Sequence, residues 1–409
     1  MNRIEFICHT KHLGAMRKIA NGAFLQVPLS LGATLRELLA KEGLTGILAI
    51  LAGRRDPVDL APLVERNLLR KRIRFERLYA NPLVAWVYCL MVMARTRLSA
   101  SLLASRFKQH PEARAFVFNG FLMPDALTLA IGNALGRERL VVELGFFPNT
   151  LQYDICGINF DSTLPRDPRF YRAIEPLIAH EKPGDVVKRR SKQKGQAIEA
   201  LPPSYIFVPM QVPSDMQILA HSPWIRDMVH FYEVLAHLAD QHPNYHFIIK
   251  EHPSFPLSIR ARIRPHPRIA FANHNDTRAL IEGAEAVITI NSTVGLEGLL
   301  LGKKVITLGN APYNIEGLVL RAGDDVSLSA ALTALPSWQA DEALRDAFIR
   351  YVYNVFLLRG DRHNPTPDMF EALLQRARRT DQHHTCLSRF SQDSRAEDES
   401  AQRSGVDQP

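Results

Sequence analysis

Two series of short apolar runs and amphipathic segments follow one another along the chain. In the first series, the apolar run at 113–120 predicts a buried strand, 124–136 carries apolar residues at helical spacing, and 139–147 predicts the next strand. The N-terminal residues 4–8 predict a further short strand. Strand, helix and strand at this spacing indicate a parallel α/β sheet.

The second series has clearer boundaries between its elements. Its apolar runs predict strands at 205–211, 245–253, 268–273, 286–291 and 304–309, and its amphipathic segments predict helices at 224–242, 276–284 and 294–303. The two series together predict an α/β chain with two doubly wound, Rossmann-like domains and a cleft between them. In such sheets the ligand lies at the carboxyl ends of the strands.

Composition divides the chain into five expected parts. These are a first domain at 1–180, a polar and basic linker at 181–204, a nucleotide-binding domain at 205–333, C-terminal helices at 334–380 and a tail at 381–409. We expect the tail to be disordered, because it is rich in Ser, Gln, Asp and Arg and has almost no apolar residues.

The most apolar segment, 83–94, has the sequence LVAWVYCLMVMA. A helix that spans a membrane needs about twenty apolar residues, so this segment is too short and a buried core helix is the favoured interpretation. The N-terminus lacks the apolar stretch of a signal peptide. We therefore expect a cytoplasmic protein that meets the inner face of the cytoplasmic membrane only from its surface.

Charge and cysteine content narrow the choice of partners. Lys and Arg number 50 against 42 Asp and Glu, which gives a net charge of +8. The tail holds six acidic and three basic residues, so the rest of the chain is near +11. An anionic partner fits this charge, but no basic motif interleaved with aromatic residues indicates nucleic acid. The cysteines are far apart and predict neither disulfides nor a zinc site: Cys8, Cys89, Cys156 and Cys386.

Candidate chemistry is densest where the strand at 286–291 meets the following helix. Asn291 ends the strand, Ser292 and Thr293 lie where the helix begins, and Gly295 would let a ligand approach the backbone. The N-terminus of a helix binds phosphate or carboxylate groups. The alternative is that Ser292 or Thr293 only caps the helix. Glu297 does not fit a capping box and could bind a ribose diol.

Two neighbouring strand ends carry further polar residues. Lys250, Glu251 and His252 end the strand at 245–253, and Gln211 ends the strand at 205–211. A histidine at this position can donate a hydrogen bond to a phosphate. The alternative for His252 is an ordinary solvated loop residue.

A pair of carboxylates in the first half predicts glycosyl chemistry. Glu143 ends a strand, and Asp154 follows in a loop. Such a pair supplies a nucleophile or charge stabiliser and a general acid or base. In the alternative, Asp154 caps a turn and Glu143 pairs with an arginine such as Arg114.

Two remaining clusters have weaker functional interpretations. A basic segment at 66–77 predicts either a solvated helix face or a cationic helix for anionic lipid headgroups: Arg66, Arg70, Lys71, Arg72, Arg74 and Arg77. The HTKH at 9–12 has no third metal ligand nearby, so we expect no metal site.

The order of these motifs resembles the bacterial capsule polysaccharide synthesis family, which includes β-Kdo transferases. The resemblance covers roughly residues 110–320 and rests on Glu143-x-Gly145…Pro148…Asp154-x-x-Gly157-x-Asn159, the Gln211 strand, Lys250-Glu251-His252-Pro253 and Asn291-Ser292-Thr293-Val294-Gly295-Leu296-Glu297. It implies a GT-B-like fold, CMP-Kdo as donor substrate without a separate cofactor, and transfer with retention of configuration.

The resemblance also implies roles for single residues. Asp154 would be the nucleophile and Glu143 the acid/base. His252 would contact the CMP phosphate, Ser292 and Thr293 the phosphate or the Kdo carboxylate, and Glu297 the ribose.

Three functions are compatible with these observations. The leading hypothesis is transfer of Kdo or a related acidic sugar from a CMP-sugar to a lipid or glycolipid acceptor at an anionic membrane surface. The second is a GT-B-like transferase that uses a UDP-sugar or a CDP-polyol. The third is a non-catalytic capsule assembly or export factor that binds other capsule proteins.

Overall fold

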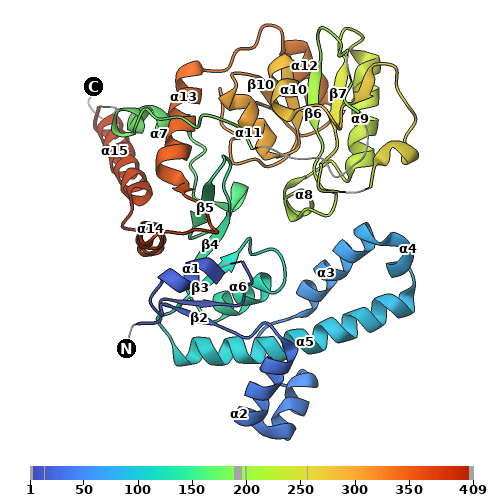
Figure 1. The fold of residues 1–409 in the computed structure, drawn as a ribbon. Coiled ribbons are helices and arrows are strands. Elements are labelled where there is room, and N and C mark those ends of the chain that lie inside the picture. Colours follow the sequence, from blue (N-terminus) through green and yellow to red (C-terminus); the bar gives the residue numbers. More distant parts are fainter. Residues whose placement is uncertain (1–2, 13, 188–195, 199, 256, 405–409) are drawn as a thin grey trace. The chain divides into compact units, whose positions relative to one another are not determined.

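The protein, described here from a computed structural model, consists of two compact units (Figure 1). The structure describes residues 3–12, 14–187, 196–198, 200–255 and 257–404. The first unit comprises Met1–Gly145, Asn149–Thr163 and Leu358–Asp381, and the second comprises Phe146–Pro148, Leu164–Leu357 and Gln382–Pro409.

The first unit contains a six-stranded sheet in the order β12-β5-β4-β3-β1-β2. Its strands are β1 (Phe6–Cys8), β2 (Phe24–Gln26), β3 (Arg114–Phe118), β4 (Arg139–Leu144), β5 (Thr150–Asp154) and β12 (Leu358–Arg359). The four strands from β2 to β4 are parallel, whereas β5 and β12 are antiparallel to their neighbours. Alternate residues along β1 and β3 enter separate apolar cores, so both sheet faces are covered.

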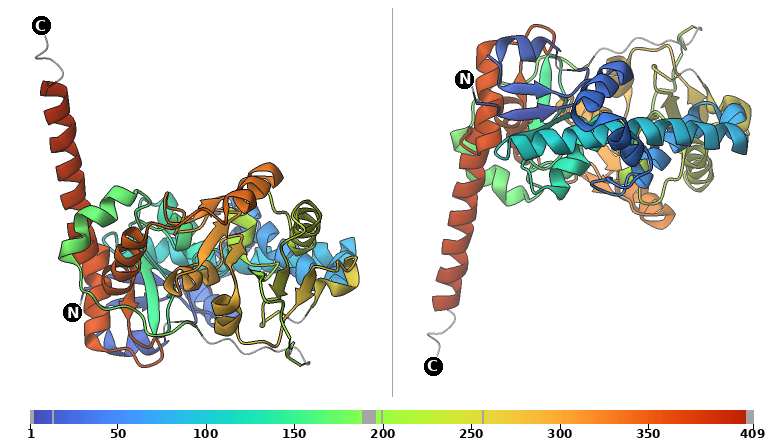
Figure 2. Two further views of the ribbon diagram at one scale, coloured as in Figure 1. Left: turned by 90° about the horizontal axis from the view of Figure 1, so that it is seen from above. Right: turned by 90° about the horizontal axis from the view of Figure 1, so that it is seen from below.

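Helices of the first unit connect its strands, and three of them form a long hairpin. They are α1 (Gly14–Ile19), α2 (Leu31–Leu51), α3 (Ala61–Arg74), α4 (Glu76–Tyr79), α5 (Pro82–Gln109), α6 (Asp125–Ala134) and α14 (Pro367–Arg378), with a 3-10 turn η1 (Asn159–Asp161). Figures 1 and 2 show α3, α4 and the N-terminal half of α5 extending beyond the strands of this unit.

The second unit contains an all-parallel sheet in the order β11-β10-β9-β6-β7-β8. Its strands are β6 (Ile206–Pro209), β7 (Phe247–Lys250), β8 (Ile269–Phe271), β9 (Ala286–Thr289), β10 (Lys304–Thr307) and β11 (Leu320–Arg321). The central strands are short runs of Val, Ile and Phe that are buried along their whole length. Such runs are typical of parallel strands with helices on both faces.

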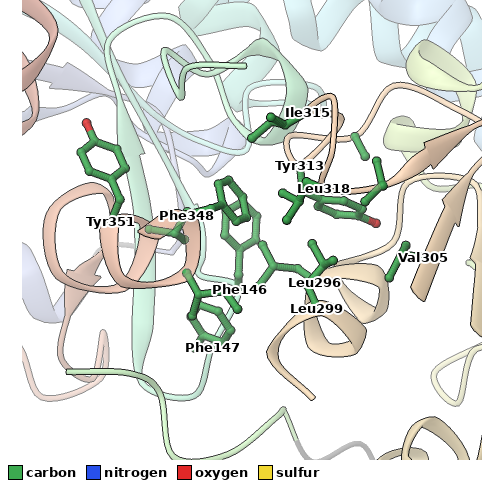
Figure 3. Packing of buried hydrophobic residues seen from close by; sticks show 14 of the residues in the cluster. Phe146, Phe147, Leu296, Leu299, Val305, Tyr313, Ile315, Leu318, Phe348 and Tyr351 are labelled. Carbon is green, nitrogen blue, oxygen red and sulfur yellow. The ribbon is translucent and has the colours of Figure 1, made fainter. Parts of the chain in front are cut away.

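Helices of the second unit enclose two cores, one on each sheet face. They are α7 (Pro168–Ile174), α8 (Met216–His221), α9 (Met228–Gln241), α10 (Thr277–Gly283), α11 (Thr293–Leu300), α12 (Asp325–Ala334), α13 (Glu342–Tyr351) and α15 (Gln382–Ser404). Shorter segments are the 3-10 turns η2 (Glu175–Leu177) and η3 (Ile259–Arg262) and the π-helical segment η4 (Val352–Phe356). In one core, Leu296 and Leu299 of α11 pack near Tyr313, Ile315 and Leu318 (Figure 3).

The predicted fold class is confirmed. Each unit has a Rossmann-like α/β architecture, and two such units in one chain make the expected GT-B-like composition. The units do not follow the expected boundaries, because residues 164–180 belong to the second unit and Leu358–Asp381 returns to the first through β12 and α14. The basic segment of the expected linker, 188–194, lies outside the described residues.

The expected disorder of the tail is wrong for its first part, because Gln382–Ser404 forms α15. His383 and Cys386 are buried, and the Tyr351 hydroxyl lies 2.5 Å from Nδ1 of His383. The Phe390 ring lies 5.4 Å from that of Phe170. The side chains of His383, Cys386 and Phe390 pack this helix against its own unit, although the composition of the segment is mostly polar.

The expected burial of segment 83–94 is also wrong. This segment forms the N-terminal half of α5, where Leu83 is 66% exposed, Trp86 59% and Met91 62%. The C-terminal half of the same helix is the part that enters the core, through Leu98, Leu103 and other residues. Hydrophobic composition identified the helix but not which half of it is buried.

Candidate functional site

Polar side chains at the ends of β6 and β9 meet in the second unit. Nε2 of Gln211 donates to Oδ1 of Asn291 at 2.9 Å, and the Asn291 backbone N–H donates to Oε1 of Gln211 at 3.3 Å. Nδ2 of Asn291 donates to the His221 carbonyl at 3.4 Å. β6 and β9 are sheet neighbours, so the predicted convergence of these two strand ends is present.

Ser292 caps α11, and its predicted contact with a ligand stays a prediction. Its backbone is extended, and its hydroxyl accepts a hydrogen bond from the Val294 N–H at 3.2 Å. The Ser292 N–H donates to the hydroxyl of Thr289 at 3.3 Å. Thr293 is the first helical residue. A capped helix start remains suitable for an anion, because one cap satisfies only one of the backbone N–H groups there.

Gly295 has a packing role rather than the expected one of admitting a ligand. A Cβ atom at this position would lie 2.2 Å from the hydroxyl oxygen of Tyr313 and 2.7 Å from the attached ring carbon. The Tyr313 hydroxyl also donates to the Ser292 carbonyl. The space beside Gly295 is therefore filled by a side chain of the same unit.

Glu297 is fully buried, and its carboxylate contributes to the environment of Tyr313. Burial, and to a smaller extent the charge of Glu297, raises the pKa of the Tyr313 phenol well above its ordinary value. In this structure Glu297 belongs to the interior of the second unit. Its predicted contact with a ribose stays a prediction.

Lys250 and Glu251 hold the loops that follow β7 and β8. Nζ of Lys250 donates to the Asn275 carbonyl. The Glu251 carboxylate accepts hydrogen bonds from the Ile259 N–H at 2.8 Å and from Nδ2 of Asn273 at 2.7 Å. These contacts fix the backbone on either side of His252.

His252 is held in one tautomer by the loop. The Ser254 backbone N–H donates to its Nδ1 at 3.3 Å, and the Ser254 hydroxyl lies 2.8 Å from the same nitrogen. A backbone N–H can only donate, so Nδ1 is the acceptor and Nε2 carries the proton of the neutral ring. Nε2 is thereby a hydrogen-bond donor, as a phosphate-binding role requires. His252 and Gln211 border the same small hollow, whose volume is about 10 Å³.

Arg114 is not the partner of Glu143 in the first unit. Arg114 pairs instead with Glu5 and Glu138. The half-buried Glu143 carboxylate accepts hydrogen bonds from Nδ2 of Asn119 at 2.5 Å and from the Leu144 N–H at 2.7 Å. These contacts orient a carboxylate at the end of β4 that retains solvent access.

Asp154 is buried, with 0% exposure, and organises its own loop. Oδ1 accepts from the N–H groups of Cys156 and Gly157, at 2.7 and 3.2 Å. Oδ2 accepts from the N–H of Thr163 at 3.0 Å and from the hydroxyl of the same residue. This arrangement is the turn-capping alternative. The role of Asp154 as a nucleophile stays a prediction, and it requires the loop to expose the carboxylate.

Other residues of the Glu143 to Asn159 motif build the same loop. A Cβ atom on Gly145 would lie 2.6 Å from the backbone carbon of Thr150, so only glycine fits this turn between β4 and β5. Gln152 and Asn159 bond reciprocally, with the Asn159 N–H donating at 2.8 Å and Nε2 of Gln152 donating back at 3.1 Å. Much of the motif therefore specifies backbone geometry.

A further carboxyl group, not predicted from the sequence, lies near Glu143. Asp125, at the start of α6, is buried and accepts a hydrogen bond from the Phe118 N–H at 2.7 Å. Burial raises its pKa to about 7, the hydrogen bonds to Phe118 and Thr10 oppose this rise, and the charge of Glu143 adds a smaller increase. An Asp in the first turn of a helix commonly offsets the helix dipole, so nothing in the sequence indicated a buried carboxyl group with a raised pKa.

A pocket of about 380 Å³ in the first unit was also missed. It is lined by His9, Lys11, Leu29, Asn67, Val92, Arg95, Thr96, Ser99, Met123, Pro124 and Leu127. His9 was considered only as a metal ligand, and among the residues that the structure describes no group of three or more His, Cys, Asp or Glu could hold a metal. The lining comes from five separate segments, which no local sequence pattern joins.

Comparison with known proteins places the chain in a family. The family described as "Capsule polysaccharide biosynthesis protein" matches residues 186–363. Protein FixF of Sinorhizobium fredii is 42% identical over 322 residues, which cover 77% of this chain and 78% of FixF. The chain belongs to the capsule polysaccharide biosynthesis family.

More distant relatives carry capsule-related names. The capsule polysaccharide export protein KpsS of Escherichia coli is 25% identical over 250 residues, covering 45% of this chain and 64% of KpsS. Among solved structures, the β-Kdo 2,7 transferase KpsC of Thermosulfurimonas dismutans aligns with 19% identity and a TM-score of 0.42, covering 68% of this chain and 89% of that chain.

Proposed function

We propose that this member of the capsule family is a glycosyltransferase that moves Kdo, or a related acidic sugar, from a CMP-sugar to a lipid or glycolipid acceptor with retention. The observation that carries the proposal is the arrangement of donors and acceptors at the strand ends of the second unit. Gln211 and Asn291 fix adjacent strand ends, and His252 presents an N–H donor beside them. Membership of the capsule family supports a role in capsule synthesis, and the resemblance of the motifs to β-Kdo transferases is the basis for the choice of sugar.

In the proposed reaction, the second unit binds the nucleotide. Nε2–H of His252 donates to a phosphate oxygen, and the start of α11 at Ser292 and Thr293 binds the phosphate or the sugar carboxylate. Glu143 is the candidate acid/base because it is the partly exposed carboxylate of its motif. Retention by double displacement requires a nucleophile of the enzyme in addition to the acceptor hydroxyl, and Asp154 remains the prediction for it.

Nucleotide binding tests the proposed donor. CMP should raise the Tm of the protein more than UDP does, because a ligand that binds the folded state stabilises it according to its affinity. His252→Ala should weaken the CMP effect, whereas His237→Ala, on the exposed surface of α9, should leave it unchanged. A larger effect of UDP would favour the UDP-sugar alternative, and no response to any nucleotide would favour the non-catalytic one.

Mass spectrometry tests the reaction itself. Incubation with CMP-Kdo should add one sugar to a single peptide if the reaction is a double displacement. An adduct on the peptide that contains Asp154 would identify the nucleophile. Release of CMP by the Glu143→Gln variant at the wild-type rate would contradict the role of Glu143.

A further inference from the structure

The hairpin formed by α3, α4 and the N-terminal half of α5 bears an exposed apolar face. On α5 this face consists of Leu83, Trp86, Val87, Leu90 and Met91, whose spacing of three and four residues places them on one side of the helix. Leu69, Phe75 and Leu78 add exposed apolar side chains from α3, the turn that follows it and α4. Residues 82–94 contain no charged side chain.

The hairpin is a formed element rather than a loose segment. The Asn81 side chain accepts hydrogen bonds from the N–H groups of Leu83 and Val84 and thereby caps α5. The rings of Tyr79 and Tyr88 meet at 5.2 Å, and Nζ of Lys71 lies 5.9 Å from the Tyr88 ring. The apolar face is therefore held in a fixed shape while exposed, and such a face marks an interaction site.

Charges beside the apolar face identify the partner. Six basic residues lie at 66–77 against a single acid, Glu76. Arg72, Arg74 and Arg77 are exposed, and within the described part of the chain no acidic side chain pairs with them. An apolar helix face flanked by basic residues and by a tryptophan is the pattern of a helix that lies in the interface of an anionic membrane.

The geometry excludes a full crossing of the bilayer by α5. This helix, Pro82–Gln109, is long and apolar enough to cross a membrane by length and composition, and 28% of its most apolar window is buried. Its second half is committed to the core through Leu102, Leu103 and Phe107. The exposed segment 83–94 extends over about 18 Å, whereas the hydrocarbon core is about 30 Å thick.

We propose that the α3–α5 hairpin inserts its apolar face into one leaflet of an anionic membrane, with the basic residues of 66–77 at the lipid phosphates. The proposal does not depend on the transferase activity. It differs from the expectation of contact only at the membrane surface, because Trp86 and its neighbours enter the acyl region.

Vesicle binding by the full chain tests this proposal. We expect the protein to float with vesicles of phosphatidylglycerol and phosphatidylcholine and to float much less with phosphatidylcholine alone. Leu90→Glu should weaken binding by about tenfold or more, since it places a charge where the proposal puts an exposed leucine among the acyl chains. Val326→Glu, at an 80% exposed position on α12, is the matched control and should bind as the wild type does.

Depth of insertion gives an independent readout. Lipids with brominated acyl chains should quench the tryptophan fluorescence of the wild type, and Trp86→Phe should remove this quenching. Unimpaired binding of Leu90→Glu, equal binding to neutral vesicles or absence of quenching would each overturn the proposal. A dimer in solution that Leu90→Glu converts to a monomer would identify a second copy of the chain as the partner instead.

Discussion

At the scale of single residues, Asp154 and Glu143 indicate that two carboxylates of one motif can have different roles, one structural and one chemical. Asp154 accepts hydrogen bonds through both oxygens, whereas Glu143 keeps a half-exposed carboxylate. A motif residue can therefore be required for the shape of a loop rather than for a reaction. Substitutions that preserve side-chain volume distinguish these two roles.

Asp154→Asn should lower the free energy of unfolding by about 1–3 kcal/mol, because an amide nitrogen cannot accept the hydrogen bonds that one carboxylate oxygen now accepts. Thermal unfolding followed by circular dichroism measures the change. Thr163→Val, which removes only the hydroxyl that bonds Asp154, should give a smaller loss. An Asp154→Asn variant that is as stable as the wild type but inactive would show a nucleophile rather than a cap.

Asp125→Asn should change how stability depends on pH. The folded protein keeps the Asp125 proton up to about pH 7, whereas the unfolded chain loses it near 3.8, so ionisation of the unfolded chain lowers stability as the pH rises between these values. The variant lacks this effect. Its Tm relative to the wild type should therefore rise between about pH 4.5 and about pH 7.5.

His9 has the opposite sign and serves as the internal comparison. Burial lowers its pKa to about 4, so the folded state binds fewer protons than the unfolded chain and stability rises with pH from about 4 to 6.5. His9 is unchanged in Asp125→Asn, so the Tm of this variant should still rise with pH over this range. A constant difference in Tm between wild type and variant across the range would contradict the buried, protonated state of Asp125.

At the scale of elements, α11 shows how a motif glycine can serve packing. Gly295→Ala should lower the free energy of unfolding by about 1–3 kcal/mol, because its Cβ would overlap the Tyr313 phenol. Gly32→Ala in α2 meets no atom within 4 Å and should be neutral or slightly stabilising, which makes it the control. Chemical denaturation measures both. Equal stability of the two variants would contradict the packing role.

Sequence periodicity predicted most of these elements but not their long-range partners. The Val and Ile runs of β6, β7 and β9 are buried on both sides, so their pattern is strong and local. β5 was missed because its sequence, TLQYD, mixes polar and apolar residues. β12 was missed because it has two residues and pairs with a strand some two hundred residues earlier. The contact of Tyr313 with Gly295 is likewise absent from any local window.

The candidate site was predictable to a similar extent. Polar residues after parallel strands lie at one edge, so the meeting of Gln211 with Asn291 followed from the pattern. The pocket lined by His9 and Thr96 depends on how the end of β1 packs against α5, and a list of residue types does not contain that information. Composition predicted the apolar character of α5, whereas its exposure depends on the length of the hairpin beyond the sheet.

At the scale of the whole molecule, the chain does not divide into two continuous domains. Leu358–Asp381 completes the first unit with β12 and α14, where the buried Arg376 bonds Asp381 and donates to the Tyr153 carbonyl at 2.6 Å. Gln382 then begins α15 in the second unit. A fragment that ends before residue 358 would lack parts of both units, so removal of the last helix alone is the informative truncation.

Deletion of 382–409 should destabilise the second unit selectively. It removes the buried His383 and Cys386 and the ring contact of Phe390 with Phe170, and it exposes apolar side chains of α7 and η4. Hydrogen exchange should accelerate in α7 and α13 but remain unchanged in β3 and β4, because α15 packs mainly against α7 and η4 of its own unit. A disordered tail predicts no change anywhere, so unchanged exchange in α7 would contradict the packed helix. Phe390→Ala should reproduce a smaller part of the same pattern, since it leaves the polar surface of α15 intact.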